Sequence, residues 1–233
     1  MEGNIAEFLG KTLLFSGLNQ GILKSFAALS SIKTFKKGEI IFSEGDEASG
    51  FYVIKQGTVR IFKISVTGRE QTLHILGPGE PFGEVAVFFG MDYPAYAMSL
   101  DVCEVLFFPK DRFVNAIKSH PDLALAMLGV LAMRLRSFSR LIEDLALKEV
   151  PQRLAAYILA VAELDARGPS ESEIKLQVSK NLLSTILGTS PETLSRVFRK
   201  LEDQEIIERK NDRISLKDLE KLRGLADGMI RLT

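Results

Sequence analysis

The clearest hydrophobic pattern in the chain runs from Pro191 to Leu201. Apolar residues recur there at positions i, i+3, i+4 and i+7, which is the spacing of one buried helix face. These apolar residues are Leu194, Val197, Phe198 and Leu201. A second set with the same interval, two residues earlier, is polar and consists of Glu192, Ser195, Arg196 and Arg199. The pattern predicts a helix with one apolar and one polar face.

The residues around this helix predict a helix-turn-helix. Ser190 can cap the helix, and Pro191 suits its first turn, where a backbone N–H is not needed. Apolar positions from 178 to 187 predict an earlier helix, and Gly188 supplies the left-handed residue that ends it. A helix, a glycine turn and a capped helix in this order are typical of a helix-turn-helix.

Two short strands, 206–209 and 213–216, are predicted to follow around a turn at 210–212, which extends the motif to a winged helix. The polar face also has side chains that suit the edges of DNA bases. Arginine can bind the two acceptors of guanine, glutamate can accept from cytosine, and serine can bond to either partner. We therefore favour a DNA recognition helix over an ordinary amphipathic surface helix.

From about residue 32 to residue 108, glycines separate short segments rich in Phe, Ile, Val and Thr. This spacing predicts a small all-β sandwich or barrel. Residues 51–54 and 58–62 read as neighbouring strands, and 67–70 reads as a hairpin tip.

The pattern changes to helix from about Lys110. A set of apolar residues spaced 3, 4, 3, 4 and 3 predicts a coiled-coil seam, formed by Leu128, Leu131, Leu135, Phe138, Ile142 and Leu145. We interpret residues from about 111 to 147 as a dimerisation helix; a long helix lying on its own β domain is the alternative. A hinge at 148–151, a helix at 152–166 and a loop at 168–172 follow, which divides the chain into domains 1–147 and 148–233.

The composition narrows the class of protein. The 233 residues carry a net charge of zero, and residues 176–213 hold seven basic and six acidic residues, so any DNA affinity must depend on charge placement and dimerisation.

Cys103 is the single cysteine, which excludes an intramolecular disulfide. The acidic N-terminus and a longest apolar run of residues 123–133 indicate a cytoplasmic protein without a membrane partner. We find no catalytic motif and expect no enzyme and no catalytic residues.

The whole order of elements, from about residue 13 to residue 220, resembles the Crp/Fnr family of bacterial transcription regulators. The residues that carry the resemblance are 37–46, 57–61 and 77–84, together with the predicted recognition helix. The resemblance implies an α+β fold with an N-terminal β-roll of the cyclic-nucleotide-binding (jelly-roll) type, a long dimerisation helix and a C-terminal winged helix-turn-helix. It implies a homodimer on an inverted-repeat operator in double-stranded DNA, and RNA polymerase is a candidate partner.

The resemblance also implies roles for individual residues. Glu192, Ser195 and Arg196 match the base-reading positions, and their pattern is that of the Fnr-like branch, whose half-sites resemble TTGA. A further four residues are assigned to phosphate contacts: Thr189, Ser190, Thr193 and Arg199.

The effector is not specified by the resemblance. Cyclic-nucleotide-binding members carry Arg-Ser eleven positions after the glycine that corresponds to Gly83, but Pro94 and Ala95 stand there in this chain. We therefore expect that cyclic AMP is not the effector, because its buried phosphate would lack a guanidinium. Residues 1–31 contain no cysteine, which argues against the iron–sulfur cluster of the Fnr branch.

Two effector classes stay open. One is heme, with His74, His120 or Cys103 as candidate axial ligands, although each also fits an ordinary structural position. The other is a small organic molecule in a pocket lined by Gly83, Glu84, Phe88, Tyr96 and Met98, which also fit an ordinary core. The alternative function is a cyclic-nucleotide-binding regulatory protein. Whether the protein activates or represses depends on where its operator lies.

Overall fold

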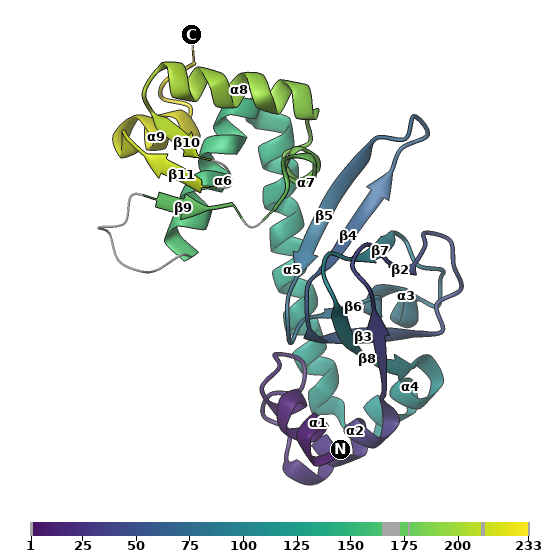
Figure 1. Ribbon diagram of the computed structural model, residues 1–233. Coiled ribbons are helices and arrows are strands. Elements are labelled where there is room, and N and C mark those ends of the chain that lie inside the picture. Colours follow the sequence, from purple (N-terminus) through teal and green to yellow (C-terminus); the bar gives the residue numbers. More distant parts are fainter. Residues whose placement is uncertain (1, 165–172, 177, 211–212, 233) are drawn as a thin grey trace. The chain divides into compact units, whose positions relative to one another are not determined.

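The computed structural model describes residues 2–164, 173–176, 178–210 and 213–232. Two compact units divide the chain, Met1–Ser137 and Phe138–Thr233 (Figure 1). The boundary between them falls inside helix α5 (Pro121–Leu147), upstream of the domain boundary that we expected after residue 147.

Two antiparallel sheets form the β-roll of the N-terminal unit, as the glycine-punctuated sequence predicted. The first sheet has the order β1 (Ser31–Phe35), β8 (Cys103–Pro109), β3 (Gly50–Gln56) and β6 (Pro81–Phe82). The second has the order β2 (Ile40–Phe42), β7 (Tyr96–Ser99), β4 (Val59–Ile64) and β5 (Glu70–Leu76).

A bulge shifts the register of the hairpin formed by β4 and β5. Ile61 pairs with His74, but its neighbour Phe62 pairs with Thr72, so one residue of β5 has no direct partner. The hairpin tip comprises residues 65–69, because Glu70 already belongs to β5. The bulge therefore determines which side chains of β5 lie on the same face of the sheet as Ile61.

The N-terminal unit has two cores. Helices α1 (Glu2–Gly10), α2 (Gln20–Leu29) and α4 (Lys110–Ser119) pack on the first sheet. Rings that are fully buried in this core belong to Phe15, Phe26, Phe51, Phe108 and Phe113. The second core lies between the sheets and includes Phe42, Tyr52, Phe82, Tyr93 and Cys103.

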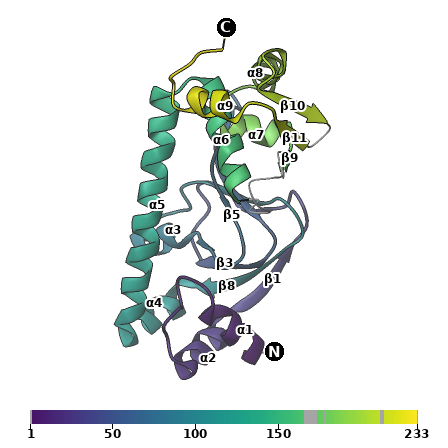
Figure 2. The same cartoon turned by 90° about the vertical axis from the view of Figure 1, so that its left-hand side faces the viewer.

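The predicted helix of about 111–147 is two helices, α4 and α5. The chain breaks at His120, whose φ of −136° and ψ of 75° are not helical. The cause is Pro121, because a proline ring disfavours helical geometry in the residue before it. Figure 2 shows α5 as one continuous helix after this break.

The C-terminal unit holds the winged helix-turn-helix. Its elements are α6 (Val150–Leu164), β9 (Glu173–Lys175), α7 (Lys180–Ile186), α8 (Pro191–Asp203), β10 (Ile207–Lys210), β11 (Arg213–Leu216) and α9 (Leu219–Ala226). The strands form one antiparallel sheet in the order β10-β11-β9. Helix α6 starts two residues earlier than we predicted. Strand β9 was not predicted, because three residues are too few to show a periodicity. The predicted end of the helix at 165–166, the loop at 168–172 and turn residues 211–212 lie outside the described residues.

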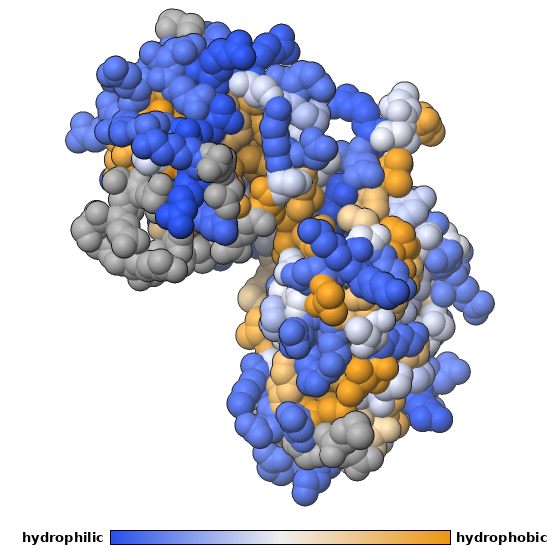
Figure 3. Space-filling view, viewed as in Figure 1, coloured by the Kyte–Doolittle hydropathy of each residue, from blue (hydrophilic) through white to orange (hydrophobic). Residues whose placement is uncertain are grey.

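Most of the surface of the C-terminal unit that Figure 3 shows is hydrophilic. Among the residues with a described position, none of the helices has both the length and the apolar character needed to cross a membrane.

Candidate functional site

The helix-turn-helix has the local structure that the sequence predicts. Ser179 caps α7, and Gly188 takes the left-handed conformation with a φ of 61°. The hydroxyl of Ser190 then caps α8 by accepting the backbone N–H of Thr193 at 3.2 Å, with Pro191 in the first turn. Both caps and the glycine are set by local sequence. The distant Arg153 also holds the turn, because its Nε donates to the carbonyl oxygen of Leu187 at 2.9 Å.

Helix α8 has the two predicted faces. Its apolar side chains are all buried in the core of the C-terminal unit: Leu194, Val197, Phe198 and Leu201. On the other face, Glu192, Arg196 and Arg199 are exposed and Ser195 is half-buried. The structure therefore brings the three predicted base-reading residues together on one solvent-facing stripe.

Two of these side chains are already held by hydrogen bonds. The hydroxyl of Ser195 donates to the carbonyl oxygen of Pro191 at 2.7 Å, so its remaining capacity is to accept. Nη2 of Arg196 donates to Oγ1 of Thr193 at 3.0 Å. The polar face therefore presents one carboxylate, one acceptor hydroxyl and one anchored guanidinium.

Glu192 stays ionised at the start of the helix. The hydrogen bond from its own backbone N–H lowers the pKa of its carboxyl, and the charges of Lys180 and Arg196 act in the same direction. A carboxylate at this end is also favoured by the helix dipole.

The four candidate phosphate-contacting residues lie on α8 or in the turn before it. Thr189 and Ser190 belong to the turn, Thr193 lies in the first turn of α8, and Arg199 is exposed further along the helix. The N-terminus of a helix offers outward-pointing N–H groups and favours anions. This position suits contacts to a phosphate backbone.

The wing is tied to the far end of α8 by Arg209 of β10. Its guanidinium binds both carboxylate oxygens of Glu202, at 2.8 and 2.9 Å, and lies over the ring of Phe198 at 4.4 Å. The fork lowers the pKa of the Glu202 carboxyl. Arg209 and Glu202 are among the charges counted in residues 176–213, but the sequence did not predict that they pair.

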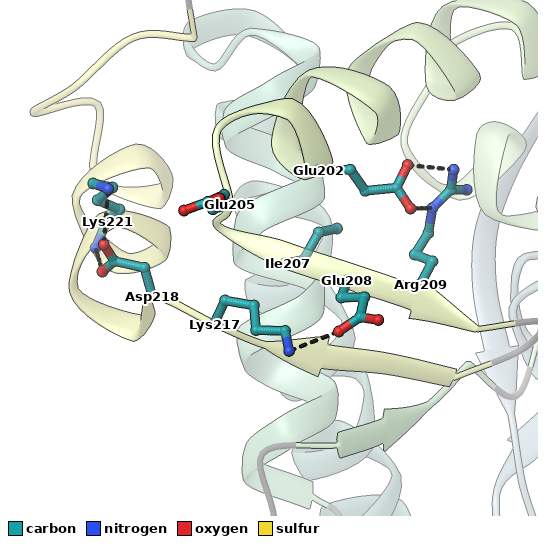
Figure 4. A pocket seen from close by; sticks show the side chains of 8 residues that line it. All are labelled: Glu202, Glu205, Ile207, Glu208, Arg209, Lys217, Asp218 and Lys221. Carbon is teal, nitrogen blue, oxygen red and sulfur yellow. Dashed lines mark hydrogen bonds and ion pairs between the residues drawn. The ribbon is translucent and has the colours of Figure 1, made fainter.

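A groove of about 610 Å³ lies beside this fork (Figure 4). Its lining side chains are mostly charged: Glu202, Glu205, Ile207, Glu208, Arg209, Lys217, Asp218 and Lys221. Several of these charges are paired, as Glu208 is with Lys217 at 2.6 Å and Asp218 with Lys221 at 3.1 Å. The groove is at the C-terminal end of α8 and adds nothing to the predicted base-reading stripe.

In the N-terminal unit, a buried ion pair occupies the predicted effector region. Glu84 begins helix α3 (Glu84–Phe89) and its side chain is 1% exposed. Arg134 of α5 donates to Oε1 of Glu84 and to the carbonyl oxygen of Pro81, while Oε2 of Glu84 has no hydrogen-bond partner within the described part of the chain. Burial raises the pKa of the Glu84 carboxyl, and the charge of Arg134 opposes that rise.

The other predicted pocket residues have separate surroundings. Gly83 needs its left-handed φ of 79°, and a Cβ there would come within 3.0 Å of the Tyr93 ring. Phe88 packs edge-on to Phe113, whereas Tyr96 stacks on Phe62 and Met98 lies two residues further along β7. Phe88 therefore contacts the core beneath the first sheet, whereas Tyr96 contacts a residue of the second sheet.

The three candidate heme ligands differ in their chemistry. Burial raises the pKa of the Cys103 thiol to about 11, and its sulfur donates to the carbonyl oxygen of Gln56, which does not fit an axial thiolate. Burial, assisted by the charge of Arg134, lowers the pKa of His74 to about 4, so its imidazole is neutral. His120 lies at the break before α5 near the ring of Phe26. Across the described ranges, no three His, Cys, Asp or Glu side chains cluster closely enough to hold a metal ion.

Two cations of the effector region were missed by sequence reasoning. Arg134 lies 50 residues along the chain from its partner Glu84, so no local pattern connects the two. Lys63 donates to the carbonyl oxygen of Pro94 at 2.9 Å and also pairs with the carboxylate of Glu44. Position 94, where cyclic-nucleotide-binding members carry an arginine, therefore has the amine of Lys63 beside its carbonyl oxygen. That amine is already paired with the Glu44 carboxylate.

The predicted seam follows α5 and is largely exposed in a single chain. Leu128, Leu135 and Ile142, spaced by seven, are 60%, 69% and 67% exposed. Leu131 and Phe138 are half-buried, and Leu145 is 37% exposed. The three positions with a seven-residue period are therefore exposed to solvent along α5.

Two family models match the chain. The model described as a cyclic nucleotide-binding domain matches residues 32–120, and the one described as a Crp-like helix-turn-helix domain matches residues 152–225. The first range corresponds to the β-roll and the second to the helices and strands of the C-terminal unit.

Curated relatives align along most of their length. The transcriptional activator protein Anr of Pseudomonas protegens is 28% identical over 202 residues, which are 85% of this chain and 81% of Anr. The cyclic AMP receptor protein of Thermus thermophilus is 27% identical over 216 residues, which are 93% of this chain and 97% of that protein. These relatives are regulators of transcription and not enzymes.

Solved structures share the fold. The regulator CLP of Xanthomonas campestris, described as responsive to c-di-GMP, has a TM-score of 0.77 at 23% identity over 85% of this chain and 99% of its own. A CooA variant from Carboxydothermus hydrogenoformans has a TM-score of 0.73 at 23% identity over 91% of this chain and 92% of its own.

The lowered pKa of His74 predicts a specific loss of stability in mild acid. The unfolded state, with an ordinary histidine pKa near 6.5, binds more protons than the folded state between about pH 6.5 and 4, so protonation favours unfolding as the pH falls through that window. We expect His74→Gln to lose less unfolding free energy than the wild type between about pH 7 and pH 5, measured by urea unfolding at both values.

Gln71→Asn, an exchange of one neutral side chain for another on the same strand, is the control and should keep the wild-type difference. Equal pH dependence of the wild type and His74→Gln would show that the imidazole is not buried as a neutral group.

Proposed function

Because the chain belongs to the Crp/Fnr family of transcription regulators, we propose that it acts as a homodimer on an inverted-repeat DNA operator with TTGA-like half-sites. The observation that carries the proposal is the exposed stripe of α8, on which Glu192, Ser195 and Arg196 follow a capped helix start. In this proposal each copy of α8 enters the major groove of one half-site, and the half-sites lie about one helical turn apart.

Each base-reading side chain suits a part of the half-site. The guanidinium of Arg196 matches the two acceptors of guanine, and the carboxylate of Glu192 can accept from the amine of the paired cytosine. The Ser195 hydroxyl donates to Pro191, so it is left as an acceptor, which suits the amine of adenine in a T·A pair. This hydrogen bond supports the preference for TTGA.

The phosphate contacts are assigned to Thr189, Ser190, Thr193 and Arg199. Their position around the N-terminus of α8 supports this role, because the positive end of the helix dipole attracts anions there. The nearly balanced charge of residues 176–213 leaves one copy little electrostatic attraction to DNA, which favours a symmetric pair.

We assign dimerisation to the seam of α5. Its exposed leucines and isoleucine repeat every seven residues, as in a two-stranded coiled coil, and burying them against a second copy would remove them from water. We keep 1–147 as the sensing and dimerisation domain and 148–233 as the DNA-binding domain, since α5 ends at Leu147. Binding to a chromosomal operator would place the protein in the cytoplasm, where RNA polymerase is a candidate partner.

The effector is proposed to act in the N-terminal unit at Glu84. Its buried, partly unpaired carboxylate has the character of a ligand-binding group. A small organic effector fits this position better than a thiolate-bound heme, since Cys103 stays a thiol; His74 keeps the chemistry of a neutral imidazole ligand. A cyclic-nucleotide-binding regulatory protein, the alternative function, would require a phosphate site that Pro94 and Ala95 do not provide.

Replacement of Arg196 tests the reading of the operator. We expect Arg196→Ala to lose about 1–3 kcal/mol of discrimination per half-site, because the bidentate contact to guanine is removed. The measurement is fluorescence anisotropy on a duplex with two inverted TTGA half-sites and on the same duplex with both guanines replaced by adenine. A variant that still preferred the guanine-containing duplex would contradict the assignment.

Replacement of seam residues tests the dimer. The double variant Leu135→Glu, Ile142→Glu places two carboxylates in the proposed interface, so we expect a monomer in sedimentation experiments and about 100-fold weaker binding to the two-half-site duplex. Arg136→Glu, which adds an acid to the same helix off the seam, should remain dimeric. A dimeric double variant would show that the helix does not form the interface.

Calorimetry of the full chain tests the exclusion of cyclic AMP. We expect no binding to the wild type at micromolar nucleotide, because the phosphate would be buried without a guanidinium and Lys63 is already paired with Glu44. The variant Pro94→Arg, Ala95→Ser restores the missing pair and should bind more tightly than the wild type. A micromolar dissociation constant for the wild type would overturn the exclusion.

A further inference from the structure

We propose that Thr193 is a positioning residue, whose hydroxyl holds the guanidinium of Arg196 ready to read guanine before DNA is bound. This inference rests on the proposed base-reading role of Arg196. It assigns to Thr193 a part in sequence discrimination, in addition to a contact with phosphate that carries no sequence information.

A chain of hydrogen bonds leads from the helix cap to the reading side chain. Oγ of Ser190 accepts the backbone N–H of Thr193 and donates to Oγ1 of Thr193, both at 3.2 Å. The same Oγ1 accepts Nη2 of Arg196 at 3.0 Å. Thr193 is half-buried, whereas Arg196 is exposed. The more buried residue therefore holds the more exposed one in place.

The guanidinium keeps enough donors to bind a base after this contact. It has five N–H groups, and one of them serves Thr193, which leaves four for the two acceptors of guanine. An exposed arginine otherwise loses much of its rotamer freedom on binding, and a contact formed in the free protein reduces that loss. The hydrogen bond to Thr193 therefore favours binding of Arg196 to guanine and does not use up the N–H groups that this binding needs.

The hydroxyl of Thr193 can also serve the phosphate backbone. A hydroxyl has one proton to donate and two lone pairs to accept with. Here Ser190 and Arg196 use the two acceptor positions, so the proton of Thr193 remains for a phosphate oxygen. One side chain would then connect the phosphate contact to the placement of the reading arginine.

Two substitutions of Thr193 separate positioning from a simple phosphate contact. Thr193→Val keeps the shape and β-branching but removes the acceptor, whereas Thr193→Ser keeps the hydroxyl. We measure binding to the TTGA duplex and to its guanine-to-adenine counterpart over a range of salt concentrations, with thermal unfolding of each full-length variant to confirm that it folds.

We expect Thr193→Val to lower the ratio of the two affinities by about 2- to 10-fold, the size of one typical net hydrogen bond, because Arg196 is exposed, and Thr193→Ser to retain the ratio. In an Arg196→Ala background, Thr193→Val should have no further effect on the ratio, because the two residues then act as one unit. Equal weakening on both duplexes, with a shallower salt dependence, would assign Thr193 to phosphate alone and overturn the proposal.

The outcomes for the two residues are distinguishable. Loss of discrimination in Arg196→Ala together with full discrimination in Thr193→Val overturns only the positioning role. Full discrimination in Arg196→Ala removes the reading role of Arg196, and the inference about Thr193 falls with it.

Discussion

The polar face of α8, which we propose reads DNA, depends on one constraint, the burial of the apolar side of the same helix. Leu194, Val197, Phe198 and Leu201 are buried in the C-terminal core, and full burial of each such side chain contributes about 1.5–3 kcal/mol. A rotation of the helix would expose these side chains, so the core fixes which residues face the solvent. The Ser190 cap holds one end of the helix, and Arg209, bound to Glu202 and lying over Phe198, holds the other. The polar stripe is the consequence of that packing.

The N-terminal unit is organised around a charged contact as well as an apolar core. The ion pair between Glu84 and Arg134 is buried. Removing one partner of such a pair lowers the free energy of unfolding by about 3–5 kcal/mol, because the other charge is left unpaired in a medium of low dielectric constant. The pair joins the start of α3 to α5, the helix that carries the exposed seam. An effector that changed the environment of Glu84 would therefore act on a residue bound to the proposed dimerisation helix.

Proteins that resemble this chain are named for different ligands. One structural neighbour is described as responsive to c-di-GMP, and a relative is named a cyclic AMP receptor protein. At 23% identity the fold persists in the regulator CLP, with a TM-score of 0.77, because a fold depends on patterns of apolar and glycine residues. Ligand choice depends on a few side chains, and we propose that Pro94 and Ala95, in place of an arginine and a serine, are among them here.

The sequence by itself determined the elements whose signals are local and periodic. The faces of α8, its serine cap, the turn at Gly188, the strands of the β-roll and the seven-residue repeat of α5 could all be read from spacing, because neighbouring positions along a helix or strand define them. Only the tertiary structure decided the contacts between distant residues. The Glu84–Arg134 pair, the fork of Arg209 on Glu202, the added strand β9 and the separate surroundings of Phe88 and Tyr96 arise from chain packing. No local pattern records how far a side chain reaches once two segments pack together. For this reason the two faces of α8 could be predicted, and the residues around Glu84 could not.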